Sequence, residues 1–189
     1  MRKNFSGKQR APMLYPQPVC IIAAYGEDGT PNAMNVAWGG VCDYDKLFFA
    51  VAADHKTTKN ILKRKAFTVS MATADFVKEC DYIGIVSGNS VPDKMARAGF
   101  RCEASAFVDA PLIAELPLAI ECELISFDPA TDYLIGHIVN VSADERILDE
   151  NGQVDPTKLR PITFDPVHMA YRVLGEAVGK AFSDGKDLK

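Results

Sequence analysis

Cysteine pairs, long apolar runs and an excess of basic charge are all missing from this sequence. Its five cysteines are widely spaced and form no C-x-x-C pair, which argues against a disulfide framework and against a zinc site. With 21 basic and 25 acidic side chains, the formal net charge is −4, whereas a general nucleic-acid-binding protein is normally basic. We therefore expect no metal site and no nucleic-acid partner.

Apolar runs are short throughout the chain. The segment LFFAVAA, residues 47–53, is far shorter than a membrane span. The N-terminal MRKNFSGKQR is positive, but the apolar segment of a secretory signal does not follow it. The sequence thus predicts a cytoplasmic protein without a membrane partner, whose cysteines are small buried apolar side chains in a reducing compartment.

Several catalytic motifs are missing as well. The sequence contains no G-x-S-x-G, H-E-x-x-H or G-x-G-x-x-G, the patterns of common hydrolases, metalloproteases and dinucleotide-binding folds. Its three histidines, His55, His137 and His168, are far apart along the chain. Hydrolytic catalysis is therefore not indicated.

The first half of the chain is rich in β-formers. Residues 19–25, 31–42 and 46–53 read as three extended segments joined by linkers too short for helical crossovers, which predicts an antiparallel meander. A helix is expected over residues 57–65 and a fourth strand over 66–72.

The second half is more irregular. Helices are predicted within residues 73–88 and 92–99. Strands are predicted over residues 102–110 and 118–128. The strand at 118–128 is expected to pair as a hairpin with a strand at 133–148. A C-terminal helix is expected from Pro166 to Phe182. Its apolar side would carry Tyr171, Leu174, Val178 and Phe182.

This order of elements is not the regular β-α alternation of a doubly wound sheet. It predicts a mainly β protein with peripheral helices, built as an antiparallel barrel or curved sheet. No linker or repeat divides the chain, so residues 1–189 are expected to form a single domain.

The stretch DHKTTKNILKRK, residues 54–65, concentrates positive charge where a helix is expected to begin. The first turn of a helix offers unpaired N–H groups and the positive end of its dipole. Thr57 and Thr58 would add hydroxyl groups, and His55, Lys56 and Lys59 would add donors or charge. Together these groups would suit a phosphate monoester. The alternative is structural: Thr57 caps the helix and KRK complements its C-terminus.

Other segments contain residues suited to a planar polar ligand. Asn32 and Asn35 can hydrogen-bond a ring edge, and Trp38 can form a flat apolar wall; alternatively, Trp38 is a core residue and the following glycine pair a bulge. Lys94 is available as a second cation. His137, in the middle of a strand, is more often a core or interface residue than a catalytic one.

In this order, the motifs resemble those of the flavin reductase-like family, which includes the flavoredoxins and has the FMN-binding split-barrel fold. The matching segments are PVCIIAAYGEDGTPNAMNVAW, HKTTKNI, SGNSVPDKMARAGF, LPLAIECELI and GHIVNV. The similarity covers roughly residues 12–175. Two features depart from the family pattern: His55 stands where arginine is often found, and the loop between Ser87 and Asp93 is short.

The resemblance implies FMN as the cofactor and assigns residues to it. The phosphate would be held by Thr57, Thr58 and Lys59, with His55 and Lys56 beside them. The ribityl chain and ring would be lined by Asn32, Asn35, Ala37 and Trp38, flanked by Ser87 and Gly88, with Lys94 and His137 near the ring. Family members are usually homodimers with FMN at the interface. A C-terminal helix containing Gly175 and Gly179 could pack there, and a plain core contact is the alternative.

The function implied is that of an FMN-dependent oxidoreductase that receives hydride from NAD(P)H at flavin N5. The protein would supply position and electrostatics, and no side chain is required as an acid or base at that step. Lys94 or His137 is the candidate for stabilising the reduced ring. Two alternatives remain: an FMN electron carrier served by a redox-protein partner, and a ligand-binding barrel without enzyme activity.

Overall fold

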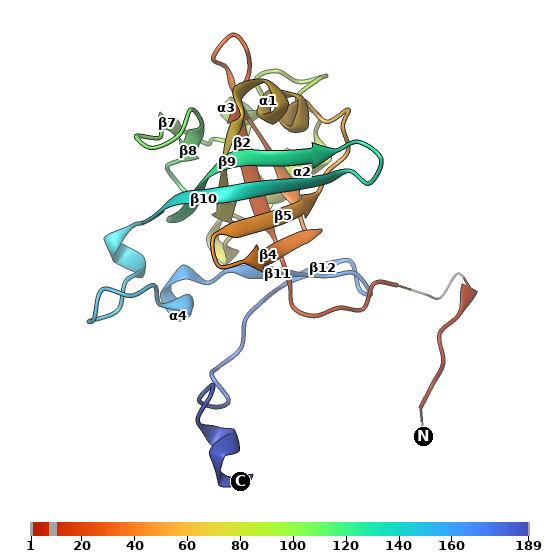
Figure 1. The fold of residues 1–189 in the computed structure, drawn as a ribbon, viewed down its shortest axis with the longest axis vertical. Helices are drawn as coiled ribbons and strands as arrows, with labels where there is room; N and C mark the ends of the chain where they lie inside the picture. Colours follow the sequence, from red (N-terminus) through yellow and green to blue (C-terminus); the bar gives the residue numbers. More distant parts are fainter. Residues whose placement is uncertain (1, 8–10, 189) are drawn as a thin grey trace.

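The computed structural model describes residues 2–7 and 11–188. Its main element is an antiparallel sheet that curls into an open barrel (Figure 1), with the strand order β3-β2-β6-β9-β10-β5-β4. The strands of this sheet are β2 (Cys20–Tyr25), β3 (Pro31–Val36), β4 (Gly39–Asp43), β5 (Lys46–Ala50), β6 (Ala66–Met71), β9 (Leu118–Asp128) and β10 (Tyr133–Ala143).

Smaller elements surround the barrel. A three-stranded sheet contains β1 (Gln17–Pro18), β11 (Ile162–Asp165) and β12 (Ala170–Val173), and a two-stranded one contains β7 (Cys102–Ala104) and β8 (Pro111–Ile113). The helices are α1 (Lys56–Arg64), α2 (Val77–Ile85), α3 (Lys94–Arg97) and α4 (Pro156–Leu159), with 3₁₀ turns η2 (Ala74–Phe76), η3 (Glu145–Ile147) and η4 (Asp184–Leu188). The prediction of a mainly β fold with peripheral helices is confirmed.

None of the helices in the described part of the chain combines the length and the apolar character needed to cross a bilayer.

The core forms on both faces of the barrel sheet, because successive side chains of a strand point to opposite faces. From β2, Ile21 faces a cluster packed under α2 and α3, whereas Ile22 faces the barrel interior. Inside the barrel the ring of Phe67 is fully buried beside Gly136, where an added Cβ would come within 2.3 Å of that ring. The sheet is therefore fixed in register from both sides.

The hairpin predicted late in the chain is confirmed, but its second strand is shorter than predicted. It ends at Ala143, and residues 145–147 form η3 instead of extended chain. Strands β9 and β10 pair with each other along their length, and β10 also pairs with β5. The helix expected within residues 73–88 is present as η2 followed by α2. The helix expected within residues 92–99 is present as α3. The helix expected at residues 57–65 begins one residue earlier, at Lys56, and ends at Arg64.

The predicted meander is wrong in one respect. Residues 31–42 do not form a single extended segment: β3 pairs with β2, β4 pairs with β5, and the two lie at opposite edges of the sheet. The two-residue step Ala37–Trp38 carries the chain between these edges. Gly39 permits the tight packing after the step, since a Cβ there would lie 2.2 Å from the Phe49 ring.

The predicted C-terminal helix is also wrong. Residues 162–165 and 170–173 instead form the β11–β12 hairpin. The physical reason lies at its turn, where the Asp165 carboxylate accepts hydrogen bonds from the backbone N–H groups of Val167 and His168 and so competes with a helical first turn. Beyond Val173 the chain leaves the body (Figure 1), with Val178 and Phe182 fully exposed.

The strand expected over residues 102–110 is much shorter than predicted. Only β7 is extended, because the Ser105 hydroxyl accepts hydrogen bonds from the N–H groups of Phe107 and Val108. Strand β8 then forms in what was expected to be a connection.

Candidate functional site

The site is built around the amino end of α1. His55 is its N-cap residue with extended backbone, and no side chain caps the first turn, so N–H groups there are available to a ligand. The alternative that Thr57 serves as the N-cap of this helix is therefore wrong. The buried hydroxyl of Thr57 accepts a hydrogen bond from Asn32 Nδ2 at 2.6 Å. This bond joins strand β3 to the first turn of α1.

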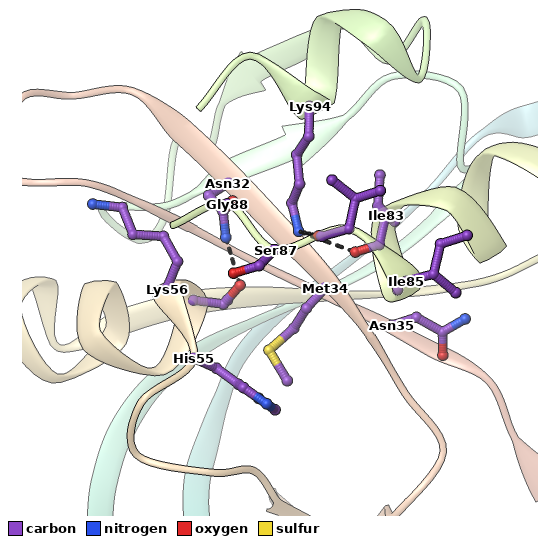
Figure 2. Close-up of a pocket in the computed structure, with 13 residues that line it drawn as sticks. Asn32, Met34, Asn35, His55, Lys56, Ile83, Ile85, Ser87, Gly88 and Lys94 are labelled. Carbon is purple, nitrogen blue, oxygen red and sulfur yellow. Dashed lines mark hydrogen bonds between the residues drawn. The ribbon is translucent and has the colours of Figure 1, made fainter. Parts of the chain in front are cut away.

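A cleft opens between α1, β3 and the end of α2 (Figure 2). Its first lobe has a volume of about 160 Å³. The side chains of His55 and Lys56 lie on one side of it, and the segment following α2 lies on the other. The lining residues are Asn32, Met34, Asn35, His55, Lys56, Thr57, Ile83, Gly84, Ile85, Val86, Ser87, Gly88 and Lys94.

Gly88 brings the backbone of the far wall close to Asn32. A Cβ at this position would lie 2.0 Å from Asn32 Oδ1, so only glycine fits without displacing that buried amide. The first lobe thus combines an uncapped helix start, a lysine and a narrow backbone wall. These are the groups that hold a phosphate monoester, and the residues present fit such a group.

Lys94 is buried beneath the first lobe, with 2% of its surface exposed. Its ammonium group donates hydrogen bonds to the carbonyl oxygens of Ile83 and Val86 at 3.0 and 2.9 Å, as Figure 2 shows for Ile83. Burial lowers the pKa of this lysine to about 8. Lys94 therefore ties down the carboxyl end of α2, and its charge favours an anionic ligand in the lobe.

The second lobe continues the cleft toward the β11–β12 hairpin and has a volume of about 320 Å³. Trp38 forms part of its wall and is 47% exposed, which excludes the alternative that it is a core residue. Phe164 and Tyr171 pack with ring centroids 6.2 Å apart. The lining residues are Met34, Asn35, Val36, Ala37, Trp38, Ala50, His55, Asp81, Gly84, Ile85, Phe164 and Tyr171. A flat apolar ring suits these walls.

Most of the residues predicted from the sequence line one of these two lobes. They are Asn32, Asn35, Ala37, Trp38, His55, Lys56, Thr57, Ser87, Gly88 and Lys94.

Three predicted residues do not line either lobe. Thr58 is fully buried and its hydroxyl has no hydrogen-bond partner among the described residues. Lys59 faces solvent on the next position of α1. His137 lies on β10, half exposed, with its Nε2 3.5 Å from the Asp45 carboxylate. Within one chain, these side chains are thus separate from the cleft.

Sequence reasoning missed ten lining residues: Met34, Val36, Ala50, Asp81, Ile83, Gly84, Ile85, Val86, Phe164 and Tyr171. One signal was available, because a glycine inside a helical pattern costs stability relative to alanine and so calls for a packing reason. At Gly84 a Cβ would lie 2.8 Å from the Cβ of Asn35. The others had no local signal, since Phe164 and Tyr171 reach the cleft only through the hairpin that replaced the expected helix.

The chain is similar to known proteins both in sequence and in structure. The sequence model of a family described as flavin reductase like domain matches residues 13–165. The structure is similar to flavoredoxin of Desulfovibrio vulgaris (Miyazaki F), with a TM-score of 0.91 and 36% identity over 98% of this chain and 100% of that one.

Two further solved structures are similar. A flavoredoxin from Methanosarcina acetivorans has a TM-score of 0.87 and 26% identity, and each chain is covered completely. An FMN-binding domain of a flavin reductases-like enzyme from Shewanella baltica OS155 has a TM-score of 0.77 and 21% identity over 89% of this chain and 91% of that one. The last similarity shows the fold alone.

Proposed function

The chain belongs to the flavin reductase-like family, and from that membership and the cleft we propose that it is an FMN-dependent oxidoreductase. The observation that carries this proposal is the continuity of the two lobes, which share Met34, Asn35, His55, Gly84 and Ile85. One lobe suits a phosphate and the other a planar ring, as FMN requires. The name of the Shewanella baltica neighbour, an FMN-binding domain, supports FMN as the flavin.

The residues of the chain would bind and orient the cofactor. Lys56 and the first-turn N–H groups of α1 hold the phosphate, and the Asn32–Thr57 hydrogen bond fixes that turn. Trp38 would cover part of the ring, and Lys94 would add positive charge below the cleft. When bound, FMN would supply the redox chemistry, with NAD(P)H as the proposed source of hydride. The protein contributes position, exclusion of water and charge.

Titration of the purified protein with FMN tests the binding site. Lys56→Ala and Thr57→Ala are expected to weaken FMN binding by about tenfold or more, or about 1.4 kcal/mol. Lys59→Ala is the matched control on the same helix, because Lys59 faces solvent and should change the affinity little. A protein that does not bind FMN, or a Lys59→Ala loss equal to that of Lys56→Ala, would contradict the assignment.

An FMN electron carrier is the second candidate, favoured by the 36% identity with a flavoredoxin over nearly the whole chain. In this case the electron donor and acceptor would be redox proteins rather than NAD(P)H. Stopped-flow reduction separates the two: rapid bleaching of the flavin by NADH or NADPH supports the reductase. Bleaching only by a reduced protein partner supports the carrier.

The proposal includes a homodimer in the cytoplasm. Exposed apolar side chains gather near the barrel edge formed by β4 and β5, including Trp38, Val41 and Tyr133. A second copy of the chain is the proposed partner for this surface. All five cysteines are free, which suits a reducing compartment.

A further inference from the structure

The second lobe contains an acidic side chain that the proposed function does not use. Among the described residues that line the two lobes, Asp81 alone carries a carboxylate. It lies on α2, and its Oδ1 accepts a hydrogen bond from the Tyr171 hydroxyl of β12 at 2.7 Å. The pair therefore joins the helix to the hairpin at the ring lobe, which both residues line.

The two lysines of the cleft lie toward its other end. Lys56 and Lys94 line the first lobe and not the second, and His55 lines both. The cleft is thus polarised, with cationic side chains where the phosphate is expected and a carboxylate where the ring is expected.

Tyr171 keeps its proton and acts as a donor. Burial, together with the hydrogen bond to Asp81 and the charge of that carboxylate, raises the pKa of Tyr171 to about 12. A neutral donor spreads the carboxylate charge but does not cancel it. The ring lobe consequently keeps the negative charge of Asp81.

A negative potential opposes the addition of negative charge to a ligand held nearby. Reduction of a flavin by two electrons and one proton leaves the ring with a negative charge, and uptake of a second proton removes that charge. We propose that Asp81 lowers the reduction potential of the bound flavin by making the lobe favour the oxidised ring over the reduced one. Tyr171 is a positioning residue that acts through Asp81. This inference rests on the proposed function.

Midpoint potentials of the FMN-loaded protein test the inference, with dithionite as the reductant and a reference dye. Asp81→Asn keeps the shape of the side chain and removes its charge. The variant is expected to bind reduced FMN about tenfold more tightly, relative to oxidised FMN, than the wild type does. For a two-electron couple this change raises the reduction potential by about 30 mV. Tyr171→Phe leaves the carboxylate without its donor and is expected to lower the potential.

The control is Glu79→Gln, which removes a charge from the same helix at a position that does not line the cleft. Its potential should equal that of the wild type. An unchanged or lowered potential in an Asp81→Asn protein that binds FMN stoichiometrically would overturn the inference. If Asp81→Asn does not fold, Tyr171→Phe provides the test. A reduction potential of Tyr171→Phe equal to or above that of the wild type would overturn the inference. Failure of the wild-type protein to bind FMN would instead overturn the proposed function.

Discussion

At the residue scale, Gly88 is the position where a single methyl group should matter most. An added Cβ would displace Asn32 and break its hydrogen bond to Thr57. We expect Gly88→Ala to weaken FMN binding by about tenfold or more, measured by quenching of flavin fluorescence. Gly175→Ala is the control, because a Cβ there meets no atom within 4 Å. Equal affinities for the two variants would show that the narrow wall does not contact the ligand.

Lys94 gives the protein a pH-dependent contribution to stability. Its pKa of about 8 in the folded protein is below the value of about 10.4 for an unfolded chain. The unfolded state therefore binds more protons between these values, and the contribution of Lys94 to the free energy of unfolding rises as the pH increases from about 8 to about 10. Deprotonation relieves the cost of burying the charge.

Urea denaturation of the wild type and Lys94→Met across this pH range checks the sign. The stability difference should move in favour of the wild type as the pH rises. Lys78→Met, which removes an exposed lysine of α2, is the control, and Lys94→Met should show the larger change with pH. A constant difference for Lys94→Met would contradict the burial of an ionised lysine.

The sequence allowed the polar half of the cleft to be predicted better than the apolar half. Asn32, Thr57 and Lys56 lie in short segments whose local chemistry suits an anion, whether or not the rest of the fold is known. Asp81 and Tyr171 carry no such local signal. Their contact depends on the β11–β12 hairpin, which is distant from α2 in the sequence and reaches it only in the folded protein. Lys59 was included because sequence spacing does not tell which side of a helix faces a ligand.

At the element scale, the β11–β12 hairpin depends on one buried carboxylate. Asp165 accepts hydrogen bonds from the Tyr15 hydroxyl, from Arg172 Nε and from the His168 backbone N–H, and its Oδ2 lies 2.9 Å from His168 Nδ1. These partners, with Tyr15 the largest influence and Arg172 next, hold the pKa of Asp165 well below its ordinary value. The stabilisation is therefore present above the unfolded-state pKa and is lost as the pH falls toward the lower folded-state value.

Asp165→Asn should thus be less stable than the wild type at neutral pH, and the difference should shrink below about pH 4. Chemical denaturation at a series of pH values measures it. Asp75→Asn is the comparison, because Asp75 forms an exposed ion pair with Arg160 and such pairs contribute about 0–1 kcal/mol. If both variants lose the same stability at every pH, the hairpin does not depend on the buried carboxylate.

Elements with regular alternation could be predicted from the sequence, and those decided by a side chain at a turn could not. The hairpin of β9 and β10 follows from two long β-rich runs around a PATD turn. Residues 166–182 have helical spacing of apolar side chains, but Asp165 closes a turn first. The edge-to-edge step at Ala37–Trp38 depends on the curvature of the whole sheet, which no local pattern encodes.

At the scale of the whole molecule, the proposed homodimer has a direct test. Light scattering after gel filtration should give twice the mass of one chain. Tyr133→Glu places a charge on the exposed apolar surface beside β5 and is expected to shift the protein toward the monomer. Val178→Glu, on the segment that leaves the body, should not. Dissociation by Val178→Glu alone would assign the interface to the C-terminal segment instead.

The step at Ala37–Trp38 also connects the edge of the barrel sheet to the ligand-binding cleft. The backbone N–H of Ala50 donates to the Trp38 carbonyl oxygen at 2.8 Å, and Ala37, Trp38 and Ala50 all line the second lobe. Breaking this hydrogen bond would separate the walls of the second lobe. The Ala50 amide should therefore exchange with deuterium more slowly once the lobe is filled, so a single backbone proton would report occupancy without any measurement of colour or turnover.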